Sequence, residues 1–175
     1  MTDKELVDRF LVERSPRNFS DLYDKCTMSL LRTGMYLTRN DRMQAEDLVQ
    51  DVWVLAISKL ETFRGESTLR TWLTGILIYK YRQGLRTDRP SKEARDLSGT
   101  LPEAKAEPMA ELAMDLKRTL LELPDGYKQI LVLHDMEGFK HREIASMLTI
   151  DEGTSKSQLF HARKAMREML QDYKH

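Results

Sequence analysis

Apolar residues recur at helical spacing along most of the chain, most clearly between residues 45 and 60. Successive apolar positions there are three or four residues apart, the spacing that gives a helix one buried face. They are Ala45, Leu48, Val49, Val52, Trp53, Ala56, Ile57 and Leu60. Asp47, Gln50 and Asp51 fall between these positions and point outward. We therefore expect a long helix with a buried apolar side and an exposed acidic side.

The same spacing predicts helices in both halves of the chain, separated by a stretch that lacks it. In that stretch, prolines, serines, a glycine and acidic residues replace the pattern, which is typical of a flexible linker. No alternating strand pattern of useful length is present. The sequence therefore predicts an all-α protein with two small helical domains, 1–87 and 108–175, joined by a flexible linker at 88–107. The expected helices cover residues 19–37, 45–60, 69–77, 112–120, 127–138, 141–148 and 151–173.

The net charge of zero conceals two basic segments. The whole chain has 28 Lys and Arg against 28 Asp and Glu, which alone argues against a nucleic-acid binder. Residues 64–89, however, hold six basic side chains and two acidic ones, and residues 153–167 hold four basic side chains and no acidic one. The acidic excess lies between them, in residues 91–125. One basic cluster is usually a solvated helix face, but two clusters on separate segments weaken that interpretation.

Several classes of protein are excluded by composition. No apolar run approaches the roughly 20 residues of a membrane span, and the first residues lack the apolar core of a signal peptide. The single Cys26 lies on an apolar helix face, and the four histidines show no zinc-binding spacing. No nucleophile, metal-hydrolase or nucleotide-binding motif is present. We expect a soluble, cytoplasmic monomer that is not an enzyme and has no metal or cofactor.

Residues 143–163 have the pattern of a helix-turn-helix. Ile144 and Leu148 would bury the first helix, Ala145 is a small residue at the crossing, and 149–152 would form the turn. The second helix would present polar and basic side chains near its N-terminus, where they can reach phosphates and base edges in a major groove. These side chains are Thr154, Lys156, Ser157, Gln158 and His161, followed by Arg163, Lys164 and Arg167.

Taken together, these motifs resemble those of the extracytoplasmic-function (ECF) sigma factors of bacterial RNA polymerase, a group of the sigma-70 family. The resemblance covers about residues 19–170, with the motifs in the family's order. The segments that carry it are AEDLVQDVW (45–53), FRGES (63–67), TWL (71–73), LP (123–124), EIA (143–145), GTSKS (153–157) and AR (162–163). It implies that residues 1–87 form sigma region 2, 88–107 a linker, and 108–175 region 4.

The resemblance also implies three sites and a function. The protein would bind core RNA polymerase, direct it to promoter DNA and assist strand opening, and an anti-sigma factor would hold it inactive. The polymerase-binding residues would be Asp47, Leu48, Gln50 and Asp51. Those for the −10 element, with its flipped base, would be Arg64, Gly65, Glu66, Ser67, Thr68, Arg70, Lys80 and Arg82. Those for the −35 element would be Arg142, Thr154, Lys156, Ser157, Gln158, His161, Arg163 and Lys164.

The sequence departs from the family pattern at three positions, and two other functions stay open. Thr149 replaces a common turn glycine and predicts a different turn geometry, while Ser155 and Gln158 replace a valine and an arginine. Trp72 is expected in the core. One alternative is a sigma-like decoy that sequesters an anti-sigma factor, which would not need the basic segments. The other is a stand-alone helix-turn-helix regulator, which would bind duplex DNA without polymerase.

Overall fold

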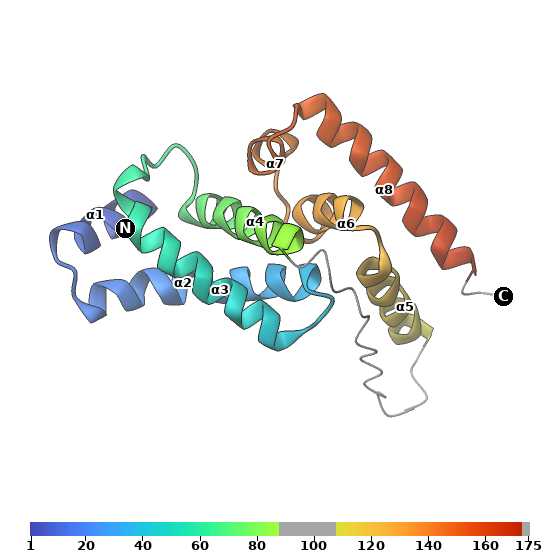
Figure 1. Cartoon of the computed structure of the whole chain (residues 1–175), viewed down its shortest axis with the longest axis horizontal. Helices are drawn as coiled ribbons and strands as arrows, with labels where there is room; N and C mark the ends of the chain where they lie inside the picture. The colour runs from blue at the N-terminus through green and yellow to red at the C-terminus, as the bar shows by residue number, and fades with distance from the viewer. Residues whose placement is uncertain (88–107, 173–175) are drawn as a thin grey trace.

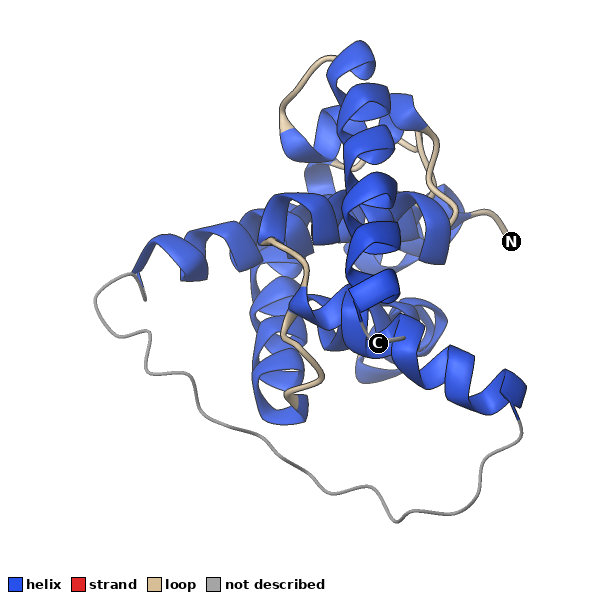
Figure 2. Ribbon diagram, turned by 90° about the vertical axis from the view of Figure 1, so that its right-hand side faces the viewer, coloured by secondary structure: helices blue, strands red, loops and turns tan. Residues whose placement is uncertain are grey.

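The computed structural model describes residues 1–87 and 108–172, and every element within them is helical (Figures 1 and 2). The all-α prediction is therefore confirmed for this part of the chain. The predicted linker at 88–107 lies outside the described residues. The elements are α1 (Asp3–Val12), α2 (Pro16–Leu37), α3 (Arg42–Lys59), η1 (Leu60–Thr62), α4 (Leu69–Thr87), α5 (Pro108–Glu122), α6 (Asp125–Leu131), η2 (Val132–Met136), α7 (His141–Leu148) and α8 (Glu152–Asp172).

The first four helices form a bundle in which α2, α3 and α4 pack against one another. The apolar side predicted for α3 is turned inward, and its Trp53 indole nitrogen donates a 3.0 Å hydrogen bond to Thr27 on α2. This bond lets a large aromatic side chain be buried without leaving its N–H unpaired. Cys26 is buried in the same interface, as predicted. The bundle thus holds the polar side of α3 toward solvent.

Helix α1 was not predicted, although its start is marked in the sequence. Thr2 and Glu5 form a capping box in which each side chain accepts a hydrogen bond from the other residue's backbone N–H. Leu6, Val7 and Phe10 bury one side of the helix against α2. The capping box followed by these three apolar residues is a recognisable helix signal, but the helix has only ten residues, so its apolar pattern is short.

In the second half α8 packs against α6 and α7, and their buried residues continue the hydrophobic core of the first half. The break predicted at Leu123-Pro124 separates α5 from α6, because proline cannot continue the preceding helix. Ile144 and Leu148 of α7 and Leu159 and Ala162 of α8 are buried, with Ala145 at the crossing. The helix-turn-helix predicted from residues 143–163 is therefore present, and its second helix, α8, runs on to Asp172.

The turn of this motif keeps a left-handed residue although it lacks a glycine. Thr149 has φ 57° and ψ 52°, and the next residue, Ile150, donates to the carbonyl of Ala145 at 3.0 Å. The different turn geometry expected for Thr149 is therefore wrong. The backbone adopts the left-handed conformation that glycine would favour. In a residue with a β-branched side chain this conformation is disfavoured sterically by about 1–2 kcal/mol.

Replacing this residue by glycine should therefore stabilise the second half of the molecule. We expect Thr149→Gly to raise the free energy of unfolding by about 1 kcal/mol in urea denaturation. Ser146→Gly is the matched control, because Ser146 is exposed within α7 and glycine in a helix interior lowers stability. A Thr149→Gly variant less stable than the parent would contradict the strained turn.

Candidate nucleic-acid interface

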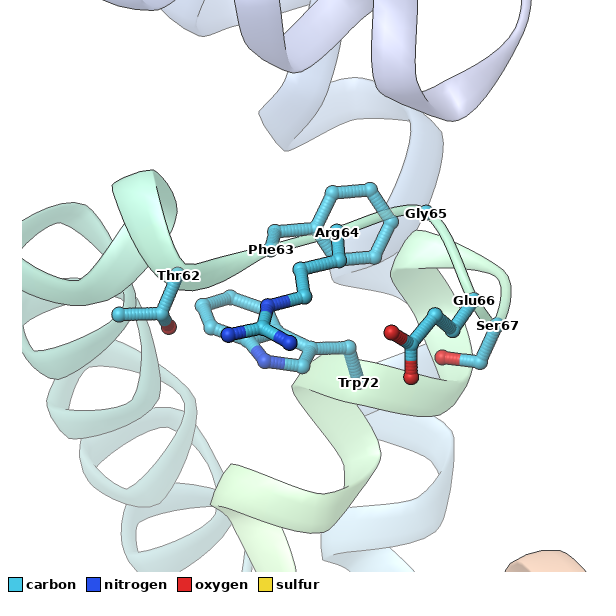
Figure 3. Close-up of a pocket in the computed structure, with 7 residues that line it drawn as sticks. All are labelled: Thr62, Phe63, Arg64, Gly65, Glu66, Ser67 and Trp72. Carbon is cyan, nitrogen blue, oxygen red and sulfur yellow. The ribbon is translucent and has the colours of Figure 1, made fainter.

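The loop between η1 and α4, residues Arg64–Thr68, borders a small cavity of about 140 Å³ (Figure 3). Gly65 has φ 75°, which lets the chain turn sharply out of the bundle. Phe63 anchors the start of the loop in the core, and the Thr68 hydroxyl caps its end by accepting from the N–H of Thr71 at 3.1 Å. The cavity is lined by Thr62, Phe63, Arg64, Gly65, Glu66, Ser67 and Trp72.

Trp72 lies at the wall of this cavity and is only half-buried. Its ring meets that of Phe63 edge to face, with centroids 5.7 Å apart. The prediction that Trp72 belongs to the core is therefore correct for one side of the ring only. The other side adds an aromatic wall to a cavity whose polar side chains come from Thr62, Arg64, Glu66 and Ser67 (Figure 3). An aromatic wall beside hydrogen-bonding groups suits a flat, unstacked base.

The basic residues predicted for the −10 element do not share one free face in this arrangement. Arg64 is exposed at the cavity. Lys80 lies 3.7 Å from the carboxylate of Asp51 on α3, and Arg82 donates a 2.8 Å hydrogen bond to the carbonyl of Leu148 on α7. Arg70 is held by the second half of the molecule. Of the four basic residues predicted for the −10 element, one is thus exposed at the loop and three are engaged elsewhere.

Arg70 is held by Glu137, whose carboxylate is fully buried between the two halves. Arg32 of α2 donates to both carboxylate oxygens at 2.9 Å, and Arg70 of α4 donates to one of them at 2.6 Å. The Arg70 guanidinium also lies 4.8 Å from the ring centre of Phe139. Burial acts to raise the pKa of Glu137, but the hydrogen bonds and charge of Arg32, followed by those of Arg70, hold it below its ordinary value.

Arg32 and Glu137 escaped the sequence analysis because they are 105 residues apart and neither belongs to a motif. Around them α4 packs against α7, and Thr71 donates a 3.1 Å hydrogen bond to Glu143. Tyr81 adds a 3.1 Å hydrogen bond to Asp125. We call this set of contacts, centred on Glu137, the interdomain clasp. It closes the first half of the chain onto the second.

The predicted −35 residues mostly lie on the exposed side of the helix-turn-helix. Ser155, which was not among the predicted −35 residues, is buried and forms a 3.0 Å hydrogen bond with His141, so it joins α8 to α7. Gln158 is half-buried. Arg163 is exposed, but it donates to Asp135 at 2.6 and 3.0 Å. The exposed residues are Arg142, Thr154, Lys156, Ser157, His161, Arg163 and Lys164.

Two apolar features of these surfaces were missed by sequence reasoning. Phe160 is 63% exposed on α8 and meets His161 edge to face at 5.5 Å. On α3, Met43 and Val54 are also largely exposed and continue, at helical spacing, the face that carries Asp47. The only sequence signal is an apolar residue at a position that points away from the buried side. Exposed apolar groups among charges are typical of binding surfaces.

The predicted polymerase-binding residues lie together on α3. Asp47, Gln50 and Asp51 are exposed, while Leu48 is half-buried and packs against the core. No group of side chains among the described residues has the composition of a metal site. Likewise, no described helix is long and apolar enough to cross a membrane.

Comparison with known proteins identifies the class to which this fold and these surfaces belong. Residues 22–90 match the model of sigma-70 region 2, and residues 113–166 match that of sigma-70 region 4. The sigma-E factor of Haemophilus influenzae, an ECF RNA polymerase sigma factor, is 30% identical over 98% of this chain and 96% of its own length. The RNA polymerase sigma-H factor of Pseudomonas aeruginosa is 27% identical, over 97% and 94%.

Two solved structures are similar along the chain. The sigma factor RpoE of Bartonella quintana, in complex with the anti-sigma factor NepR, matches with a TM-score of 0.67 and 26% identity, covering 89% of this chain and 98% of its own. CnrH, in complex with the cytosolic domain of CnrY, has a TM-score of 0.70 over 97% of both chains, and at 21% identity it supports the fold alone. The chain belongs to the ECF sigma factors of the sigma-70 family.

The interdomain clasp predicts a pH-dependent opening. Because Glu137 has a lowered pKa, its contribution to stability is complete above about pH 4.5 and is lost as the pH falls below that value. We expect the radius of gyration, measured by small-angle X-ray scattering, to rise below pH 4.5 in the parent. In Glu137→Gln it should already be larger at pH 6, because a neutral amide pairs weakly with two arginines.

Glu46→Gln is the matched control for this measurement. It removes an exposed ion pair with Arg42 within α3 and should leave the radius of gyration unchanged at pH 6. Equal radii for Glu137→Gln and the parent at every pH would show that the carboxylate does not hold the two halves together.

Proposed function

We propose that this protein is a promoter-specificity subunit that binds core RNA polymerase, directs it to promoters with −10 and −35 elements and assists strand opening. It performs no catalysis of its own and acts in the cytoplasm with the polymerase. The observation that carries the proposal is the pairing of two different surfaces in one chain. Region 2 has a cavity with an aromatic wall beside a polar loop that carries Arg64, and region 4 has an exposed polar recognition helix.

At the −10 element the loop would receive a base from the opened strand. The half-buried Trp72 offers a ring face or edge, and Glu66 and Ser67 offer groups that can pair with a base edge. Arg64 would meet a phosphate next to that base. These contacts require a single strand, because a base within the duplex cannot enter the cavity.

At the −35 element the first turns of α8 would enter the major groove. Lys156 would contact a phosphate, and the amide of Gln158 can pair with the edge of an adenine. Phe160 and His161 extend this face with an exposed aromatic pair. The buried Ser155 supports the helix from behind. The outward face of α3, with Asp47 and Asp51, would dock on a basic surface of the core polymerase.

The clasp makes the closed arrangement an inactive form under this proposal. Arg70 and Arg82 are needed for the phosphates of the opened strand but are bound to Glu137 and to the carbonyl of Leu148. The two regions must also separate to reach two promoter elements. An anti-sigma factor, such as the one bound to the similar RpoE, would act on this closed form.

Run-off transcription with reconstituted holoenzyme on a promoter library tests the function. We expect initiation at a defined set of promoters with both elements and none above background with core polymerase alone. Binding of a purified anti-sigma factor without promoter-specific initiation would support the decoy. Tight, sequence-specific binding to duplex DNA by the protein alone would support the stand-alone regulator.

Replacing Lys156 by alanine should weaken promoter binding by the holoenzyme in a salt-dependent way. Loss of one phosphate contact should lower the salt slope of binding by roughly one and affinity by about tenfold at low salt, for every −35 sequence alike. Lys117→Ala is the matched control, because Lys117 is also exposed but lies on α5 and is not one of the residues predicted for the −35 element. Equal effects of the two substitutions on promoter binding would show that α8 does not contact the DNA through Lys156.

A further inference from the structure

The first turn of α1 contacts the loop of region 2, although it lies outside both the matched residues 22–90 and every motif of the sequence. The carboxylate of Asp3 accepts a 2.7 Å hydrogen bond from the backbone N–H of Leu69, which is 66 residues away. Leu69 is the first residue of α4 and follows directly on the loop Arg64–Thr68. The N-terminal residues therefore hold the point at which the loop ends.

Asp3 acts as a second cap on α4. The Thr68 hydroxyl accepts from the N–H of Thr71, as described, and the N–H of Leu69 would have no intrahelical partner without Asp3. A carboxylate at a helix N-terminus also interacts favourably with the helix dipole. The two caps together fix the backbone on the C-terminal side of the loop.

Lys25 of α2 holds the Asp3 carboxylate in place. Its ammonium lies 2.5 Å from the oxygen that does not bond to Leu69, so the two oxygens have separate partners. Burial acts to raise the pKa of Asp3, but the hydrogen bond from Lys25, followed by that from Leu69, lowers it. Asp3 is therefore a charged acceptor at neutral pH. It links α1, α2 and α4 at one point.

Lys4 supports the other end of the loop. A Cβ on Gly65 would lie 3.3 Å from the Cβ of Lys4, so the glycine lets the loop backbone rest against this side chain. A groove of about 410 Å³ lies between residues 2–4 and residues 65–68. The loop residues Gly65, Glu66 and Ser67 line both the cavity and this groove. The contacts of Lys4 and Asp3 at the two ends of the loop therefore bear on the shape of the cavity.

We propose that Asp3 is a positioning residue for −10 recognition, which sets the position of the loop Arg64–Thr68 from outside it. The inference rests on the proposed function, since it concerns how the same cavity selects its base. Asp3 does not touch DNA. It fixes the first backbone N–H of α4, and through it the placement of Ser67 and Trp72, which both line the cavity. Losing it would let the loop move while leaving α3 and α8 unchanged.

The test compares holoenzymes carrying Asp3→Ala, Asp3→Asn and Asp21→Ala. Asp21→Ala is the matched control, because the Arg9–Asp21 ion pair also joins α1 to α2 but does not reach the loop. The readouts are base preference at each −10 position in run-off transcription and the fluorescence of 2-aminopurine placed at those positions in the non-template strand. Affinity for core polymerase and the melting temperature are measured in parallel.

We expect Asp3→Ala to reduce discrimination between −10 bases by roughly tenfold and to lower the 2-aminopurine signal, because a charge-assisted hydrogen bond is lost. Asp3→Asn keeps an oxygen acceptor for Leu69 and should recover most of the discrimination. Asp21→Ala should match the parent, and core affinity and −35 preference should stay within about twofold in all three.

Unchanged −10 preference in Asp3→Ala would overturn the inference, as would an equal loss in Asp21→Ala, which would indicate a general effect of loosening α1. A loss of core affinity that parallels the loss of discrimination would also overturn it. The parent holoenzyme distinguishes the two proposals. If the parent initiates at no promoter, the proposed function is wrong. If the parent initiates normally, the results for the variants test the role of Asp3 alone.

Discussion

The arrangement of this molecule depends on one buried carboxylate. Glu137 lies between the two halves with its side chain fully covered, and such a charge is tolerated only when it is paired. Arg32 and Arg70, both from region 2, supply the pairing at 2.6–2.9 Å. The half-exposed Arg32 is screened by water, so the interaction is modest compared with a fully buried pair. The pairing with Glu137 nevertheless engages guanidinium groups that the phosphates of a nucleic acid could also bind.

Because the arginines that pair with Glu137 could also bind phosphate, closure of the two halves competes with nucleic-acid binding. A carboxylate and a phosphate compete for the same guanidinium group, and the carboxylate has the advantage of belonging to the same chain. The neutral net charge fits this picture, because acidic side chains such as Asp51, Asp135 and Glu137 already pair with Lys80, Arg163 and Arg70. Under the proposed function, random DNA gains little from so few free cations, and contact with polymerase must precede the release of the rest.

Sequence patterns predicted the local structure well and the long-range contacts poorly. The apolar side of α3, the helix-turn-helix and the break before α6 follow from helical spacing, capping and proline, all of which act within a few residues. The clasp joins residues 105 positions apart, and Asp3 reaches Leu69 across 66, so no local pattern marks either contact. At Thr149 the packing of α7 against α8 imposed a left-handed residue that its side chain disfavours. For the candidate sites, the residue types could be predicted from the sequence. Which of their basic side chains are paired with acidic groups or carbonyls elsewhere in the chain could not.

Locking the clasp by a disulfide tests most directly whether closure and promoter use exclude each other. A Cβ on Gly75 of α4 would lie 3.9 Å from Cγ of Met147 on α7, so side chains at these two positions meet where α4 packs against α7, and the native Cys26 is buried. Run-off transcription would be measured with the Gly75→Cys, Met147→Cys double variant, oxidised and reduced, beside each single variant. We predict that the oxidised double variant does not initiate and that reduction restores initiation to the level of the single variants. Normal initiation by the fully oxidised protein would contradict the account.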